Sequence, residues 1–421
     1  MFTTFHAMNR DRGGGLFNPS GIQLNQTLLE PDHYLNSVVL ATNKDGNRVA
    51  IGDDGVGDNL VTIMEYDSST STFQMIGYID GAPYANAGGN SNSWKFGNIV
   101  RLNGDGNRLV IWDYWQLRIF DYDGTSWNES VSMNNLETHP HVPYGIDINL
   151  NGDKLIAAYL DLEKVVLYDI SNSTPTVILE DNFSGTDPNV QYHRPRRVSI
   201  SDTGDAFVLG ITKSMVSEMV GGGFSTGKAF VYETNDNWNT HTRTAFESSY
   251  PPGEHNDNYY YATTLMLNGP GDSIVIGNSL TKSRNCSFPD SNLAGEVYIY
   301  KKNGTTWQEH GVLSHEPCSS AQSTQLGSNV CINDNGNIVV ACGGERIYIF
   351  KLENNNWVEV TNISGNSTYS WLGKTQVQMK EDSIAMNGEG TRLYARSLED
   401  GQETYPTWPV YFSQVNVFDI V

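Results

Sequence analysis

The chain has few cysteines and few basic residues. Its 421 residues include four cysteines, and 26 lysines and arginines are outnumbered by 48 aspartates and glutamates, so the formal net charge is −22. This charge argues against nucleic acid as a partner, because its phosphates would be repelled. The acidic residues are spread along the whole chain, which indicates a solvated acidic surface rather than an acidic tail.

Long apolar runs are also absent from the sequence. A membrane-spanning helix needs about 18 or more consecutive apolar residues, and no such run occurs, so we expect no membrane insertion. The N-terminal stretch "MFTTFHAMNRDRGG" lacks the basic start and apolar core of a signal peptide. Three expectations remain open: use inside a cell, assembly into a particle there, or a signal that has been removed.

Familiar catalytic motifs are missing as well. No G-x-S-x-G, H-E-x-x-H or phosphate-binding glycine loop occurs, and His139-Pro-His141 has no further ligands at a recognisable spacing. The segment "SISDTGDAF" is similar to the Asp box of sialidases but lacks its closing aromatic residue, and Arg194, Arg196 and Arg197 are adjacent rather than spread over separate repeats. We therefore predict a protein that is not an enzyme and has no cofactor.

What the sequence does contain is a pattern that recurs seven times. An aliphatic residue is followed three positions later by Asn or Ser, six positions later by Gly, and then by a second apolar run. The glycines are Gly46, Gly106, Gly152, Gly204, Gly271, Gly336 and Gly390. A supersecondary unit repeated at roughly 45 to 65 residues is typical of a propeller or a solenoid, and the irregular spacing favours the propeller.

Each repeat predicts four strands, A to D. Aliphatic residues on both sides of the glycine turn predict a tight A–B hairpin. A third strand, C, carries one aromatic residue per repeat, and most repeats place a large residue at the start of strand D. The strand-C aromatics are Tyr66, Phe120, Tyr168, Tyr232, Tyr300, Phe350 and Phe418, and the strand-D residues are Phe73, Trp127, Trp238, Trp307 and Trp357.

The seventh repeat has no room for its strand D, because only three residues follow Phe418. The unpaired strand-like segment at residues 21–29 is expected to supply that strand and so to close the ring. The sequence therefore predicts an all-β, seven-bladed β-propeller with four-stranded blades. We expect an N-terminal arm at residues 1–20 and a single propeller domain at residues 21–421.

The turn sequence "RLNGDGNRL" resembles calcium-binding loops, which raises the question of a metal. Its last ligand position is apolar in every repeat, as at Leu109 and Leu155, and these residues are expected to face a core. We therefore predict no metal site and assign the turn to hairpin geometry.

The cysteines lie in the fifth and sixth repeats. Cys331 and Cys342 occupy strands A and B of one hairpin, where they are expected to be buried without a bond. Cys286 and Cys318 fall in two loops that leave the same face of a propeller, so either a disulfide or two free thiols is expected. The spacing matches no zinc motif.

All long insertions fall in the B–C and D–A connections, which share one face of a propeller. That face is the predicted place for a ligand or a protein partner, although the aromatic residues there could equally pin loops to the blades. The candidate binding residues are Trp94, Trp115, His139, His141, His193, Tyr259, Tyr260, Trp371 and Trp408.

The units "FGNIVRLNGDGNRLVIWDY" and "LGSNVCINDNGNIVVACGG" resemble FG-GAP-related propeller repeats, and the resemblance covers nearly the whole chain. Four residues depart from the consensus glycine that follows strand B: Trp112, Ala158, Cys342 and Arg396. Such repeats are similar to ones in surface and secreted proteins of marine bacteria and algae, and in large DNA viruses that infect algae. The resemblance implies adhesion or scaffolding more often than catalysis.

We expect a non-enzymatic structural or interaction propeller, either a capsid-associated external component of a virion or a cell-surface component that mediates protein–protein contact or host attachment. Two alternatives stay open: a secreted, lectin-like carbohydrate-binding propeller and a propeller glycoside hydrolase. The expected partners are other proteins of a surface or capsid assembly, or glycans, and the expected location is the virion, the cell surface or the extracellular space.

Overall fold

The computed structural model describes most of the chain. The described residues are 22–28, 38–53, 60–84, 96–112, 116–133, 143–183, 190–215, 227–247, 261–279, 295–314, 325–343, 346–364, 383–405 and 408–420. The predicted N-terminal arm, residues 1–20, lies outside this set.

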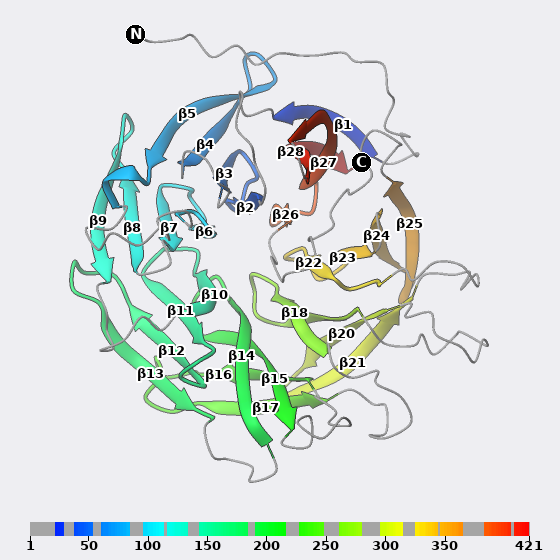
Figure 1. Cartoon of the computed structure of the whole chain (residues 1–421). Helices are drawn as coiled ribbons and strands as arrows, with labels where there is room; N and C mark the ends of the chain where they lie inside the picture. Colours follow the sequence, from blue (N-terminus) through cyan, green and yellow to red (C-terminus); the bar gives the residue numbers. More distant parts are fainter. Residues whose placement is uncertain are drawn as a thin grey trace. The chain divides into compact units, whose positions relative to one another are not determined.

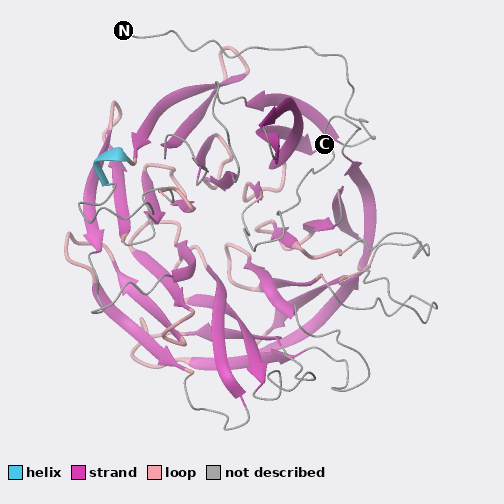
Figure 2. Cartoon of the chain, in the orientation of Figure 1, coloured by secondary structure: helices cyan, strands magenta, loops and turns pink. Residues whose placement is uncertain are grey.

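The chain folds into seven four-stranded antiparallel sheets, which are the blades of a β-propeller. Six blades are simple meanders of four consecutive strands, and Figure 2 shows how strands dominate the described chain. Among the described residues the single helical element is the short 3-10 helix η1 (Ala82–Tyr84). The predicted all-β, seven-bladed fold is confirmed.

The chain divides into two compact units, and the prediction of one domain at residues 21–421 stays a prediction. Unit 1 comprises Met1–Ser132, Glu345–Tyr348 and Val360–Val421, and unit 2 comprises Met133–Gly344 and Ile349–Glu359. Unit 1 contains blades seven, one and two, whereas unit 2 contains blades three, four, five and most of blade six.

Figure 1 labels the strands of unit 1. Blade one consists of β2 (Val38–Thr42), β3 (Arg48–Asp53), β4 (Leu60–Asp67) and β5 (Thr72–Asp80). Blade two consists of β6 (Ile99–Leu102), β7 (Arg108–Trp112), β8 (Leu117–Tyr122) and β9 (Trp127–Met133). Blade seven consists of β26 (Ile384–Met386), β27 (Arg392–Tyr405), β28 (Trp408–Ile420) and β1 (Ile22–Leu28).

The remaining strands make blades three to six. Blade three is β10 (Pro143–Ile148), β11 (Lys154–Tyr159), β12 (Lys164–Asp169) and β13 (Thr176–Asn182). Blade four is β14 (Val190–Ile200), β15 (Ala206–Met215), β16 (Gly227–Glu233) and β17 (Thr242–Glu247). Blade five is β18 (Tyr261–Leu267), β19 (Ser273–Asn278), β20 (Glu296–Asn303) and β21 (Thr306–Leu313), and blade six is β22 (Asn329–Ile332), β23 (Ile338–Gly343), β24 (Arg346–Glu353) and β25 (Asn356–Ser364).

The N-terminal strand β1 completes the last blade, as predicted. It pairs antiparallel with β28, from Ile22 opposite Ile420 to Leu28 opposite Val415. The C-terminal repeat therefore gains an outer strand, and β28 gains a partner on its outer side.

The core lies between neighbouring blades because inner strands are buried on both faces. Every residue of β19, "SIVIGN", is buried, which explains its continuous aliphatic run, whereas the outer strand β13 is largely exposed. One cluster joins Phe207 of blade four to Ile156 of blade three, and another joins Phe73 of blade one to Tyr394 of blade seven. Burial of such side chains stabilises the folded state by about 1.5–3 kcal/mol each.

The consensus glycine expected after strand B lies inside that strand, next to its last residue, and marks a close approach between blades. A Cβ at Gly52 would lie 2.2 Å from the carbonyl oxygen of Gly97, and one at Gly277 would lie 2.2 Å from that of Gly327. A larger side chain would therefore push the next blade away. Arg396 occupies the corresponding position of blade seven and is only 2% exposed.

Two local expectations were wrong. Trp238 does not begin an outer strand: it lies in a turn before β17 with a φ of 70°, where it stacks on Phe207. The segment "SLEDGQETYPTWPVY" is not a long loop, because β27 and β28 continue through it and remain paired up to Tyr405 and Trp408. At Trp238 the packing of the indole on Phe207 holds a turn where a strand was expected, and in the second segment strand pairing overrode the turn signals of the sequence.

Candidate functional site

The predicted binding residues fall largely in segments outside the described residues. This holds for Trp94, Trp115, His139, His141, Tyr259, Tyr260 and Trp371, and for Cys286 and Cys318. The backbone places His193 in β14 opposite Lys213, and Trp408 at the start of β28 opposite Tyr405. The proposed shared site therefore stays a prediction. Cys331 and Cys342 are buried, as expected, and no disulfide joins them.

The opposite ends of the blades carry the A–B turns, and the Asn or Ser of each repeat organises them. In blade one, Asn43 Oδ1 accepts the backbone N–H groups of Asn47 at 3.1 Å and Arg48 at 2.9 Å. Gly46 closes the turn with a φ of 65° and donates its N–H to the Asn43 carbonyl at 3.0 Å. The column residues that accept N–H groups in the same way are Asn103, Asn149, Ser201, Asn268, Asn333 and Asn387. The repeated motif is thus used for backbone hydrogen bonding.

Backbone hydrogen bonds also join successive A–B turns. In unit 1, Gly388 N donates to Lys44 O at 2.8 Å, and Lys44 N donates to Gly104 O at 3.2 Å. In unit 2, Leu150 N donates to Asp202 O at 3.1 Å, and Asp202 N donates to Gly269 O at 2.8 Å. This end of each unit is a bonded structural layer, which agrees with the uniform length of its turns.

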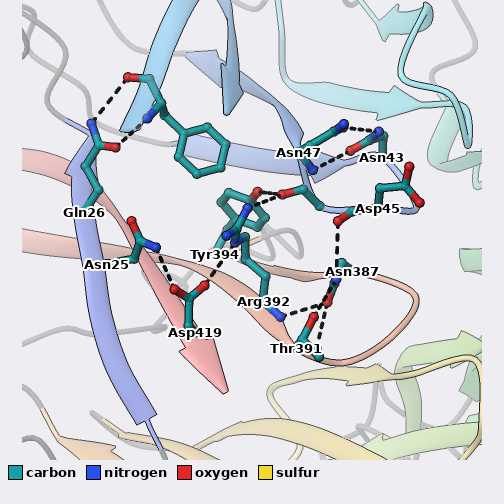
Figure 3. A network of polar contacts seen from close by, with 12 residues as sticks. Asn25, Gln26, Asn43, Asp45, Asn47, Asn387, Thr391, Arg392, Tyr394 and Asp419 are labelled. Atoms are coloured by element: carbon teal, nitrogen blue, oxygen red, sulfur yellow. Dashed lines mark hydrogen bonds and ion pairs between the residues drawn. The ribbon is translucent and has the colours of Figure 1, made fainter. Parts of the chain in front are cut away.

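A basic residue at the start of strand B fastens one blade to the next. Arg392 of blade seven donates to Asp419 at 3.1 Å (Figure 3) and to Gly46 O at 3.1 Å. Its guanidinium lies 4.4 Å from the centre of the Tyr66 ring. Arg48 repeats this arrangement between blades one and two, with a bond of 2.7 Å to Gly106 O. Sequence reasoning missed this contact, although four of the seven repeats carry Arg or Lys two positions after the turn glycine, at Arg48, Arg108, Lys154 and Arg392.

Polar bonds of β1 secure the junction of blades seven and one. Gln26, which is buried, accepts the N–H of Phe73 at 2.7 Å, and Asn25 donates to Asp419 at 2.6 Å (Figure 3). Tyr394 donates its hydroxyl to Gly46 O at 2.6 Å, and its burial raises the pKa of that hydroxyl. This network joins blades seven and one through their facing sheets.

The C–D turns contain carboxylates that cap backbone N–H groups. Asp123 Oδ1 accepts from the Thr125 hydroxyl at 2.7 Å and from the N–H groups of Thr125 and Ser126, each at 2.8 Å. These hydrogen bonds hold the pKa of Asp123 well below its usual range. The hydroxyl and N–H of Ser171 lower the pKa of Asp169 in the same way. These acids are structural caps of the kind expected in Asx turns.

Blade four contains an aromatic cluster beneath its A–B turn. Trp238 is 6% exposed and donates its indole N–H to Gly204 O at 2.9 Å. Tyr232 stacks on Phe207 and donates its hydroxyl to Asp181 at 2.6 Å. Burial, followed by this bond to Asp181, raises the pKa of Tyr232. The cluster fills the junction with blade three, so its aromatic rings stabilise the fold.

Blade five contains a cluster of polar side chains on its strands β18, β19 and β20. Asn278 is completely buried, and neither polar atom of its carboxamide has a hydrogen-bond partner among the described residues. Glu296, its cross-strand neighbour, is 1% exposed and accepts the Tyr298 hydroxyl at 2.9 Å. Burial raises the pKa of Tyr261, whose hydroxyl lies 3.3 Å from that of Tyr300. Asn278, Glu296 and Tyr261 are therefore buried polar groups of blade five.

The described part of the chain contains neither a metal-ligand cluster nor a membrane-spanning helix. No three His, Cys, Asp or Glu side chains gather there as a metal site would require. None of the helices found in the same residues has the length and apolarity needed to cross a membrane.

Solved structures with the same fold define the class as a β-propeller. The WD40 repeats of RRP9 match 96% of this chain and 98% of their own, with a TM-score of 0.57 and 11% identity. The β-propeller domain of Cps50 (Swd1) from Myceliophteria thermophila matches 95% and 100%, with a TM-score of 0.56 and 13% identity. The periplasmic gluconolactonase PpgL of Pseudomonas aeruginosa matches 79% and 86%, with a TM-score of 0.51 and 13% identity.

At these identities the likeness shows the fold alone. No known family profile and no curated protein matches the sequence. A propeller fold is compatible with a protein-interaction role, and the function must be argued from the features of this chain.

Proposed function

We propose that this chain is a non-enzymatic interaction propeller that binds other proteins through the ends of the blades where the B–C and D–A connections emerge. The observation that carries the proposal is the contrast between the two ends of the blades. The A–B turns are uniform, and the hydrogen bonds of the Asn column occupy their polar groups. The connections at the other end differ in length and sequence from blade to blade, as binding segments on a rigid scaffold do.

The acidic surface and the FG-GAP-like repeats support a more specific proposal. With a net charge of −22, the chain is suited to basic protein partners rather than to nucleic acid. We place it as an external, capsid-associated component of a virus particle or as a cell-surface component that mediates attachment. The resemblance to FG-GAP-related repeats, in which adhesion and scaffolding are common, is the basis for this placement.

Three parallel assays on the purified full chain separate the classes of function. The chain is applied to a glycan array, incubated with chromogenic glycosides and sugar lactones, and used as bait against fractions of its native source. We expect stoichiometric retention of a protein and no signal in the first two assays. Saturable binding to a sugar would favour a lectin, turnover of a glycoside or lactone would establish an enzyme, and either result would overturn the proposal.

A further inference from the structure

The chain contains eight Asn-x-Ser/Thr sequences in which x is not Pro, and this sequence, the sequon, is the acceptor for an N-linked glycan. Asn285 and Asn366 lie outside the described residues, and the sequon of Asn182 ends outside them. Every sequon that begins in the described residues falls in an outer strand D or at the C–D turn before it. Their asparagines are Asn25, Asn128, Asn172, Asn182, Asn303 and Asn362. The A–B turns are rich in Asn but contain no sequon, so the sequons follow the position in the blade rather than the Asn content.

Three of these sequons are exposed at every residue. Residues 172–174 lie in the turn between β12 and β13, residues 303–305 lie at the tight turn between β20 and β21, and residues 128–130 are near the start of the outer strand β9. A Cβ added at Gly304 would meet no atom of the described residues within 4 Å, so the space beside this turn is open. A glycan is bulky and hydrophilic, so it requires an acceptor that stays exposed in the folded chain.

Two other complete sequons differ, because they are partly buried. Asn25 and Asn362 are half-buried, and the residues that follow them, Gln26 and Ile363, are 7% and 1% exposed. The Asn25 side chain also donates to Asp419 at 2.6 Å. A glycan on either asparagine would have to fit against side chains that pack into the blade. The structure thus separates the exposed sequons from others with the same sequence pattern.

The three exposed sequons share one end of their blades. In an antiparallel meander the A–B and C–D turns leave one end, and the B–C and D–A connections leave the other. Residues 172–174 and 303–305 are at C–D turns, and Asn128 is the second residue of β9, directly after the C–D turn of blade two. Glycans at these places would cover the end with the uniform turns and would leave the variable connections free to bind.

We propose that Asn128, Asn172 and Asn303 carry N-linked glycans. The donor is a sugar joined through a diphosphate to a lipid or a nucleotide. The bond from sugar C1 to the diphosphate oxygen breaks, a bond from C1 to Asn Nδ2 forms, Nδ2 loses one proton, and the diphosphate leaves. One N–H remains on Nδ2, so Asn128 keeps a donor for the Asp123 carboxylate, which accepts at 2.9 Å. This inference rests on the external placement proposed above, because N-linked glycans are typical of surface and secreted proteins.

Mass spectrometry of the full chain from its native source tests the inference. The chain is digested, and fragmentation that preserves the sugar bond locates any added mass. We expect hexose or N-acetylhexosamine mass on Asn128, Asn172 and Asn303, and none on Asn25 or Asn362. Unmodified asparagine at the three exposed sites would overturn the inference, and so would equal modification of the half-buried sites.

A matched pair of variants, produced in the native source, tests whether the sequon itself directs the modification. Thr174→Ala removes the hydroxyl that the sequon requires, whereas Ser173→Ala changes the middle position, which tolerates any residue except Pro. Both residues are exposed, so neither change should alter the Tm. Thr174→Ala should lose the sugar mass on Asn172, Thr174→Ser should restore it, and Ser173→Ala should keep it. Sugar that persists in Thr174→Ala, or that is lost in both alanine variants, would contradict a sequon-directed site.

The outcome is separable from that of the proposed function. If the native chain carries no sugar but retains a protein partner, the inference fails and the interaction role stands. If the chain carries the sugars but retains no protein, the interaction role fails and the modified sites stand.

Discussion

Arg392 provides the sharpest test of how neighbouring blades are held together. Its guanidinium contacts Gly46 and the Tyr66 ring of blade one and Asp419 of its own blade, and the side chain is 16% exposed. Replacement by Met keeps the aliphatic stem and removes the charge. The Gly46 carbonyl keeps the Tyr394 hydroxyl as a donor, so the substitution leaves no buried acceptor without a partner.

The expected cost is the sum of three modest contributions. A net hydrogen bond contributes about 0.5–1.5 kcal/mol. A partly exposed cation–π contact contributes about 0.5–1 kcal/mol. The Asp419 carboxylate is more than a third exposed, so its ion pair contributes at most about 1 kcal/mol. We therefore expect Arg392→Met to lower the free energy of unfolding by about 2–3 kcal/mol.

Urea unfolding followed by tryptophan fluorescence measures this change. The midpoint should fall while the m-value stays constant. Arg346→Met is the control, because Arg346 is exposed at the start of β24 and its replacement should change stability by less than about 0.5 kcal/mol. A double-mutant cycle with Tyr66→Leu should give a coupling of about 0.5–1 kcal/mol. A loss below about 1 kcal/mol for Arg392→Met, or no coupling, would refute the inter-blade contact as described.

Three further predictions concern the turns and the closing strand. Gly46→Ala should destabilise the fold by more than about 1 kcal/mol, because Gly46 has a φ of 65° and the new Cβ would lie 2.7 Å from Asn387 Cβ. A thermal melt measures this change, and an unchanged Tm would contradict the prediction. Gln26→Ala should cost about 1–2 kcal/mol in urea unfolding, since it leaves the Phe73 N–H without its acceptor, and Gln26→Glu should recover part of the loss. The pKa of Asp123 is lowered in the folded state, so its contribution to stability is complete above about pH 4 and is lost as the pH falls through the folded pKa. Asp123→Asn should therefore flatten the dependence of Tm on pH below about 4. If the Tm of the variant and of the parent fall in parallel with pH, the cap is refuted.

The sequence predicted the blades because one physical requirement repeats in each. A tight A–B hairpin needs a residue with positive φ, and Gly46 and its equivalents supply it at the same place in every repeat. The missing outer strand at the C-terminus likewise pointed to β1. Pattern and register thus determined the fold.

Other features were not visible in the pattern. Trp238 has the residue type expected in strand D, but its indole packs on Phe207 beneath the turn. Whether the indole packs there or in an outer strand depends on the surrounding tertiary structure, which the repeat pattern does not describe. The continuation of β27 through Glu399 and Asp400 conflicts with the usual depletion of acids in strands, and only the facing strand β28 explains it. Topology assigns the candidate binding residues to one end of the blades. Their mutual contacts depend on the conformation of the B–C and D–A connections, whose sequences differ from repeat to repeat and so cannot be predicted from the repeated pattern.

The most direct test of the central claim is a cross-linking map of the chain in its native assembly, made with a carboxylate-reactive reagent suited to its many acids. We predict that cross-links to other proteins concentrate in the B–C and D–A connections, with few at Asp45, Asp105 or Glu389 in the A–B turns. A map in which partners cross-link mainly to those turns, or in which no protein is cross-linked, would contradict the account.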